Sequence, residues 1–68
     1  MKKVKISTEY IKLDQFLKYV GVVSNGGEAK FLIADGLATV NGETELRRGR
    51  KLRINDVVEF GDNKFVIT

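Results

Sequence analysis

The spacing of apolar residues changes from a helical to a strand-like period at Gly36, and this change limits the folds open to the chain. Before this glycine, two stretches carry apolar residues three and four positions apart. After it, short runs alternate apolar and polar residues and are separated by glycine, asparagine and aspartate. Helices grouped before strands predict an α+β domain rather than alternating strand and helix units.

Two helices are predicted before Gly36. The first covers about residues 12–20 and is followed by Gly21, in the position where a left-handed residue commonly ends a helix. The second covers about residues 26–35, begins after Asn25 and is ended by Gly36. The apolar stripes are Leu13, Phe16, Leu17 and Val20 in the first helix, and Ala29, Leu32 and Ile33 in the second.

The remaining segments predict short strands. Asn41-Gly42 is the strongest turn signal, because this dipeptide favours a two-residue type I′ hairpin. The strands expected are Lys3–Ile6, Leu37–Val40, Glu43–Leu46, a pair around Leu52 and Ile54, Val57–Phe60 and Lys64–Ile67. We expect Phe16, Phe60 and Phe65 in the core, Phe31 packed against the sheet, Tyr10 and Tyr19 exposed, and Glu43 and Glu45 solvated beside the hairpin turn.

The chain is short and lacks both cysteine and histidine. Its 68 residues suffice for one domain with a single core, and no linker or internal repeat interrupts them. Without these two residue types there is no disulfide, no thiolate metal site and no usual general base. No nucleotide-binding glycine motif or nucleophile–base set occurs either. We expect one non-enzymatic domain, residues 1–68, with no cofactor and no metal.

Nothing in the sequence predicts insertion into a membrane. No apolar run approaches the roughly 20 residues that cross a bilayer. The lysine-rich start, Met1 to Ile6, lacks the apolar stretch of a signal peptide. We therefore expect a cytoplasmic protein with no membrane partner.

Basic residues are concentrated in one short segment. Five of the seven residues from Arg47 to Arg53 are basic and none is acidic, although the net charge of the chain is only +3. Both faces of such a segment would be basic if it were extended, which suits a phosphate backbone that curves around it. The crowding indicates a polyanion partner; the alternative is a solvated turn whose charges serve only solubility. The basic residues are Arg47, Arg48, Arg50, Lys51 and Arg53.

The start of the second helix is another candidate site. Asn25 and Glu28 have the spacing of a capping box, which makes Gly26 and Gly27 the first helical residues. Two glycines there cost about 1 kcal/mol each relative to alanine. They leave backbone N–H groups unshielded, and such donors suit a phosphate, with Lys30 one turn further adding a charge. The alternative is a glycine turn that lets the first helix pack closely.

Five short motifs occur in an order that resembles a known family. They are Lys12-Leu13-Asp14-Gln15-Phe16-Leu17-Lys18, Glu28-Ala29-Lys30-Phe31-Leu32-Ile33, Gly36, Val40-Asn41-Gly42 and Asp56-Val57-Val58-Glu59-Phe60. Over about residues 10–60 the chain resembles the alpha-L RNA-binding domain named after ribosomal protein S4. Its Gly-Gly-Glu-Ala-Lys run is similar to that of small bacterial members that consist of little besides this domain.

The resemblance implies both a fold and a binding surface. Two helices would pack against a small, bent antiparallel sheet of about 4–5 strands. Structured RNA, either ribosomal RNA or tRNA, would lie across the helix pair and the adjoining loop, with the ribosome as a further expected partner. The resemblance assigns contacts to Lys12, Lys18, Asn25, Gly26, Gly27 and Lys30, and supports contacts from Arg47, Arg48, Arg50 and Lys51. Family members commonly have arginine where this chain has Gly26, so backbone N–H groups would make the contact there.

Two other functions stay open at this point. A basic patch does not distinguish RNA from DNA, so a DNA-binding accessory in replication or repair is one alternative. A protein-interaction module is the other. In the RNA-binding interpretation we expect a monomer. Replacing Arg47, Arg48 and Arg50 by alanine would then weaken RNA binding and have little effect on folding.

Overall fold

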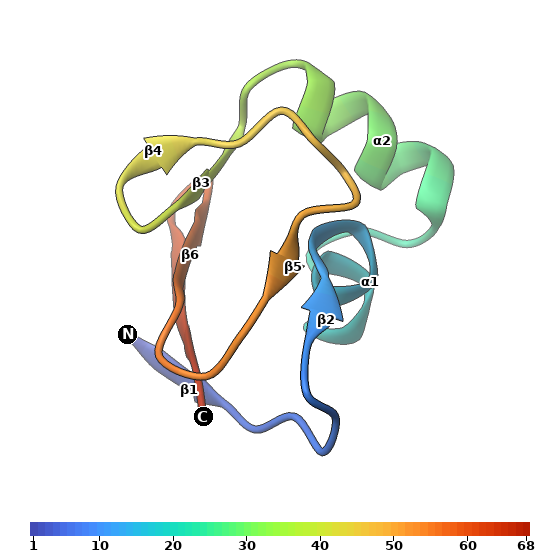
Figure 1. Cartoon of the computed structure of the whole chain (residues 1–68). Coiled ribbons are helices and arrows are strands. Elements are labelled where there is room, and N and C mark those ends of the chain that lie inside the picture. Colours follow the sequence, from blue (N-terminus) through green and yellow to red (C-terminus); the bar gives the residue numbers. More distant parts are fainter.

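The computed structural model describes residues 1–68 and confirms the α+β class (Figure 1). Both helices begin and end within one residue of the predicted bounds. With seven and nine residues, neither helix is long and apolar enough to cross a membrane. The elements are β1 (Lys2–Val4), β2 (Ile11–Lys12), α1 (Leu13–Tyr19), α2 (Gly26–Ala34), β3 (Ala38–Val40), β4 (Glu43–Thr44), β5 (Lys51–Leu52), β6 (Val57–Phe60) and β7 (Asn63–Ile67).

Five strands form one mixed sheet in the order β1-β7-β6-β3-β4. The pairs β3–β4, β3–β6 and β6–β7 are antiparallel, as expected. The first strand differs, because β1 joins the sheet beside the last strand and runs parallel to it, with Lys3 opposite Val66. The expectation of a wholly antiparallel sheet is therefore wrong for this edge. The two remaining strands, β2 and β5, form a separate antiparallel ribbon.

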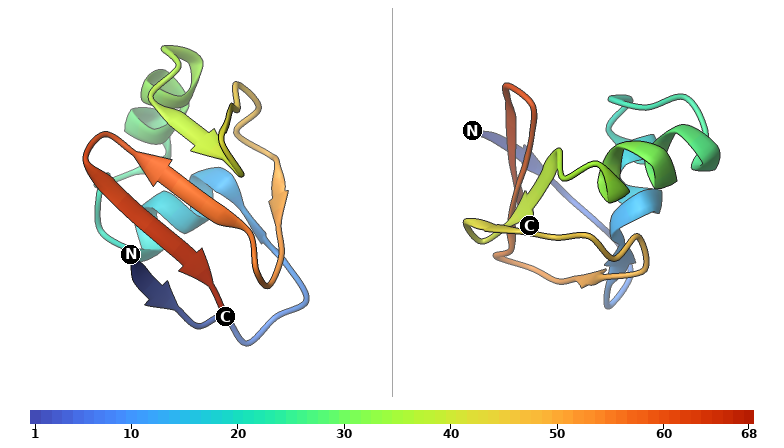
Figure 2. Two further views of the ribbon diagram at one scale, coloured as in Figure 1. Left: turned by 90° about the vertical axis from the view of Figure 1, so that its left-hand side faces the viewer. Right: turned by 90° about the horizontal axis from the view of Figure 1, so that it is seen from above.

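The helices cover one face of the sheet, and the β2–β5 ribbon lies where the two layers meet (Figure 2). The rings of Phe16 in α1 and Phe65 in β7 meet edge to face, with centroids 5.6 Å apart, and so join the two layers. The core comprises Leu13, Phe16, Leu17, Val23, Ala29, Ile33, Ala38, Val40, Leu52, Val58, Phe60, Phe65 and Ile67. The core positions predicted for Phe16, Phe60 and Phe65 are confirmed.

The predicted hairpin is also confirmed. Asn41 and Gly42 have φ angles of 52° and 87°, the positive values that a type I′ turn requires at both positions. The turn places Val40 directly opposite Glu43. Asn41 also ties this hairpin to the segment before β6, because its side chain donates to Asp56 at 3.0 Å and accepts from the Val57 N–H at 2.8 Å.

Two side chains lie where the sequence did not predict them. Phe31 is 70% exposed instead of packed against the sheet. It lies about 200° around α2 from Ala29, whose side the core occupies. Glu45 is only 6% exposed instead of solvated. It follows β4, where its N–H donates to the carbonyl of Ala38, and two arginines meet its carboxylate.

The contrast between the two phenylalanines gives a test of the packing. Phe16→Leu is expected to lower the free energy of unfolding by about 1–2 kcal/mol, because it leaves space between the layers. Phe31→Leu is the matched control and should change it by less than about 0.5 kcal/mol. Urea unfolding followed by circular dichroism measures both. Equal losses would contradict the arrangement of the helices on the sheet.

Candidate nucleic-acid interface

The basic loop, residues 45–50 between β4 and β5, is fixed against the start of α1 (Figure 1). The Leu13 N–H donates to the carbonyl of Arg50 at 2.8 Å, and the Asp14 N–H donates to the carbonyl of Arg48 at 3.0 Å. The first N–H groups of a helix have no partners within the helix. The loop supplies those partners, so its backbone position is tied to that of α1.

A buried carboxylate holds two arginine side chains of this loop. Glu45 accepts from Arg47 Nε at 2.9 Å and Nη2 at 3.1 Å, and from Arg50 Nη1 at 2.7 Å. The Arg47 backbone N–H donates to the same carboxylate at 3.1 Å. The side chain of Glu45 is 8% exposed, whereas those of Arg47 and Arg50 are 74% and 32% exposed. One interior acid therefore orients two guanidinium groups at the surface.

These bonds keep Glu45 ionised. The hydrogen bond from Arg47 is the main cause that lowers the pKa of Glu45 from 4.5 to about 2, with help from Arg50 and against burial, which raises it. Because the carboxylate stays charged, it offsets part of the positive charge of the loop. Arg48 and Lys51 have no carboxylate within salt-bridge distance, so their charges remain available to a ligand.

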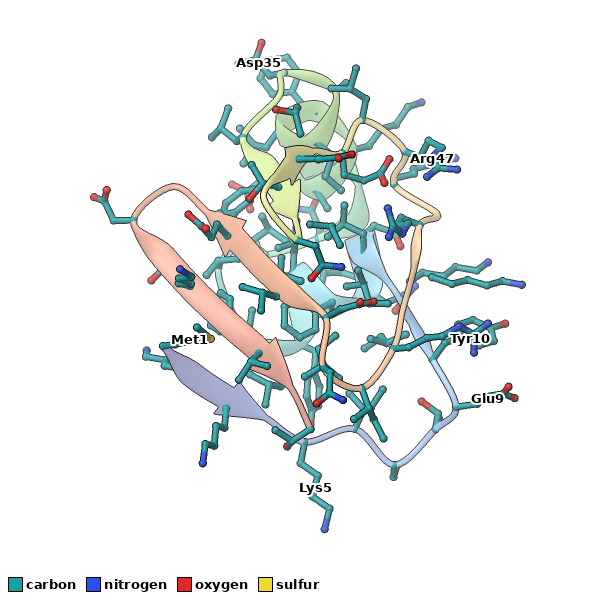
Figure 3. All side chains as sticks on the ribbon, turned by 60° about the vertical axis from the view of Figure 1, so that its left-hand side comes forward. Met1, Lys5, Glu9, Tyr10, Asp35 and Arg47 are labelled. Carbon is teal, nitrogen blue, oxygen red and sulfur yellow. The ribbon has the colours of Figure 1, made fainter.

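The loop and the start of β5 line an open hollow of about 550 Å³. Arg47, Gly49, Arg50 and Lys51 line it, and no apolar residue does. Figure 3 shows Arg47 projecting from the same side of the molecule as Tyr10, with Met1 on the opposite side. Guanidinium groups held in place around such a hollow suit phosphate oxygens, which they can bind with two parallel hydrogen bonds.

The β2–β5 ribbon brings Lys12 to the same place. Lys12 lies directly opposite Lys51 in the ribbon, so both side chains leave it on one face. Ile11 and Leu52 form the other pair, and Leu52 is fully buried. Like charges directly opposite each other destabilise a pair of strands unless an anion lies between or above them. Around the start of α1 the structure thus gathers Lys12, Arg47, Arg48, Arg50 and Lys51.

The start of α2 has the predicted cap. The Asn25 side chain accepts from the Glu28 N–H at 2.8 Å, while the Glu28 carboxylate accepts from the Ser24 N–H at 2.6 Å, one residue earlier than in a standard capping box. A Cβ at Gly26 would meet no atom within 4 Å. Close packing against α1 therefore does not explain Gly26. A Cβ at Gly27 would touch only the Asn25 side chain, at 3.3 Å.

Lys18 and Lys30 belong to the helix pair rather than to the loop. Lys18 is half-buried in the last turn of α1, and Lys30 is exposed in α2. Neither forms an ion pair. No hydrogen bond or ion pair joins these lysines, or the Asn25–Gly27 segment, to the basic loop. The predicted residues therefore fall into two groups, one at the loop and one on the helices.

Sequence reasoning missed Glu45 and Tyr10, and it placed Arg53 in the basic segment without assigning it a contact. Glu45 was expected in solvent, and neither Tyr10 nor Arg53 was among the predicted contacts. In the structure the ring of Tyr10 lies 4.9 Å from Lys51 Nζ and 5.6 Å from Arg53 Cζ. The pairing of β2 with β5 brings these distant segments together, and no local pattern indicates that pairing.

The chain is similar to proteins that support the predicted resemblance. The sequence model of the family described as "S4 domain" matches residues 4–68. A curated relative, "Probable ribosome maturation protein RlbA" of Bacillus subtilis (strain 168), is 48% identical over 57 residues, which cover 84% of this chain and 80% of the relative. A structural neighbour is the 30S ribosomal protein S4e of Thermoplasma acidophilum, with a TM-score of 0.63 and 21% identity. That match covers 85% of this chain but 31% of S4e, so the fold is what the two share.

The Glu45 site predicts how stability depends on pH. The free energy of unfolding should fall between about pH 4.5 and about pH 2, because unfolded Glu45 takes up a proton near pH 4.5 and folded Glu45 only near pH 2. Glu45→Gln should lower stability at neutral pH by about 1–3 kcal/mol, a moderate value because water screens the largely exposed Arg47. Urea unfolding at several pH values should show the difference between the two proteins shrinking toward pH 2. A difference that stays constant would show that the carboxylate charge is not responsible.

Proposed function

Because the chain belongs to the S4 domain family, we propose that it is a non-enzymatic domain that binds structured RNA, ribosomal RNA or tRNA. The observation that carries this proposal is the meeting of cations from two distant segments at the start of α1. Lys12 and Lys51 lie opposite each other without an acidic partner, beside the arginine-lined hollow. A phosphate backbone is the ligand that such an arrangement favours.

The loop and the helix pair have different parts in the proposed binding. The basic loop contacts phosphates through side chains whose positions Glu45 and the β2–β5 ribbon fix. The start of α2 offers the backbone N–H groups of Gly26 and Gly27 to another phosphate, with Lys30 adding charge. Lys18 and Asn25 complete the surface of the helix pair. Phosphate contacts set the position of the RNA, and its shape decides which RNA is accepted.

The Bacillus subtilis relative suggests the setting. It is named as a probable ribosome maturation protein, and we propose a ribosome-related role for this chain as well. The RNA would then be ribosomal, and the protein would act in the cytoplasm as a monomer.

Binding to a fragment of ribosomal RNA at two salt concentrations tests the proposal. Affinity should fall steeply with salt, since each phosphate contact releases condensed counterions. A DNA duplex of matched sequence should compete less well than the RNA. Preference for DNA would favour the accessory role in replication or repair. No binding to either at low salt would overturn the proposal and leave the protein-interaction alternative.

The loop contribution is best tested with Arg48 and Lys51. Arg48→Ala with Lys51→Ala should reduce the slope of log affinity against log salt by roughly one to two, because two phosphate contacts are lost. Lys2→Ala with Lys3→Ala removes the same charge from β1 and serves as the control. An equal loss in both double variants would mean that net charge, and not the loop, determines binding.

Arg47 and Arg50 are unsuitable for this test. Removing them would leave the Glu45 carboxylate buried without its partners, which costs stability. The sequence predicts little effect on folding from alanine at Arg47, Arg48 and Arg50, whereas the ion pairs with Glu45 predict a loss of stability at Arg47 and Arg50. Combining Arg47→Ala and Arg50→Ala with Glu45→Gln removes the buried charge as well.

A substitution at Gly26 is expected to change the stability of the fold and the affinity for RNA in opposite directions. Gly26→Ala should raise the free energy of unfolding by up to about 1 kcal/mol, since alanine favours the helix and its Cβ meets open space. The same Cβ should weaken RNA binding, because it stands beside the N–H groups offered to phosphate. Thermal unfolding and RNA titration of one preparation give both values. Unchanged affinity would remove Gly26 from the proposed surface.

A further inference from the structure

The outer face of the β2–β5 ribbon carries three cations and one aromatic ring, and two of the cations contact the ring. We call the four residues Tyr10, Lys12, Lys51 and Arg53 the ribbon face. Lys12 and Lys51 share this face because they are directly opposite in the antiparallel pair. The contacts of Lys51 and Arg53 with the Tyr10 ring place these two cations around it. Lys12, Lys51 and Arg53 are exposed, and Tyr10 is half-buried.

The backbone beneath the ribbon face is held in place. On the inner side, Leu52 is fully buried and opposes Ile11. The Arg53 N–H donates to the Asp56 carboxylate at 2.8 Å, and Asp56 is held in turn by Asn41 at 3.0 Å. The side chains of the ribbon face therefore project from an ordered frame, which lowers the entropy lost when they bind a ligand.

Charge on the ribbon face is barely neutralised. The one acid that pairs with it is Glu9, which is 84% exposed and lies 3.4 Å from Arg53. An exposed pair of this kind contributes little to stability and yields readily to a stronger anion. Lys12 and Lys51 have no acidic partner. The face also continues into the hollow of the basic loop, because Lys51 belongs to both.

A basic strip with an aromatic ring in it is the arrangement that single-stranded nucleic acids favour. Phosphates follow the cations, while an unpaired base stacks on an aromatic ring or on a guanidinium plane. A duplex offers no free base to such a ring. The ring of Tyr10 would therefore add nothing to the binding of a fully paired RNA, although the cations would.

We propose that the ribbon face binds a single-stranded segment of RNA that leaves the structured part held by the basic loop. Phosphates of this segment contact Lys12, Lys51 and Arg53, and one unpaired base stacks in the cluster of Tyr10 and Arg53. The inference rests on the proposed function, since it needs an RNA that is already bound at the loop.

The test compares a short RNA hairpin with the same hairpin carrying an oligoadenylate extension of about eight nucleotides at its 5′ or its 3′ end. The protein contains two tyrosines and no tryptophan, so Tyr19→Phe leaves Tyr10 as the only fluorescent side chain. With this variant, an extended RNA should quench the tyrosine emission and the trimmed hairpin should not. In the wild-type protein, one of the extensions should tighten binding by about tenfold, the gain expected from one stacked base.

Variants of the ribbon face sharpen the comparison. Tyr10→Leu with Arg53→Gln should abolish the gain from the extension and change the affinity for the trimmed hairpin by less than threefold. Lys3→Gln is the control, because it removes one positive charge, as the double variant does, but leaves the ribbon face intact. It should keep the gain in affinity from the extension. Glu9→Gln should increase the gain, because it removes the acid that competes for Arg53. Circular dichroism of each variant checks that the fold is retained.

Two outcomes separate this inference from the proposed function. If the trimmed hairpin binds, and neither extension adds affinity or quenches Tyr10, the ribbon face does not bind a single strand and the proposed function stands. If the variant Tyr10→Leu with Arg53→Gln keeps the full gain in affinity from the extension, the ribbon face is likewise not the binding site, and the proposed function stands. If neither hairpin nor extended RNA binds at low salt, the proposed function fails and this inference fails with it.

Discussion

The two hydrogen bonds between the first N–H groups of α1 and the carbonyls of Arg48 and Arg50 connect the fold to its surface chemistry. A helix must satisfy its first donors, and here a loop rich in arginine does so. The loop therefore does not need secondary structure of its own to be ordered. While the carbonyls of Arg48 and Arg50 bond to the helix, the side chains of Arg47 and Arg48 are exposed and that of Glu45 is buried. When α1 forms, these hydrogen bonds therefore also position the backbone of the basic loop.

A domain of this size has little stability to spare, and it still buries an acid. Glu45 is buried with two arginine partners at a site where an apolar residue would often be no less stable. Unlike an apolar residue, the carboxylate orients two guanidinium groups through hydrogen bonds. Such preorganisation reduces the entropy lost on binding, at the cost of part of the positive charge.

The parts of the fold that local patterns encode could be predicted. The helix bounds follow from apolar spacing and from Gly21, Asn25 and Gly36, and the hairpin follows from Asn41-Gly42. The parts that depend on distant pairing could not. The parallel β1–β7 edge and the β2–β5 ribbon involve segments that are far apart in the chain, and no periodicity indicates which strands meet. Local charge crowding predicted the basic loop, whereas the burial of Glu45 and the contact of the Tyr10 ring with Lys51 depend on the tertiary fold and were not predicted.

The β1–β7 pairing has a consequence for how the protein is made. Lys3 leaves the ribosome long before its partner Val66 does. β1 therefore stays unpaired until β7 has been made, and contacts of such long sequence separation form slowly. A nascent chain can close its helices and the Asn41-Gly42 hairpin while still attached. The complete sheet, and with it the full stability of the domain, forms only after β7 has left the ribosome.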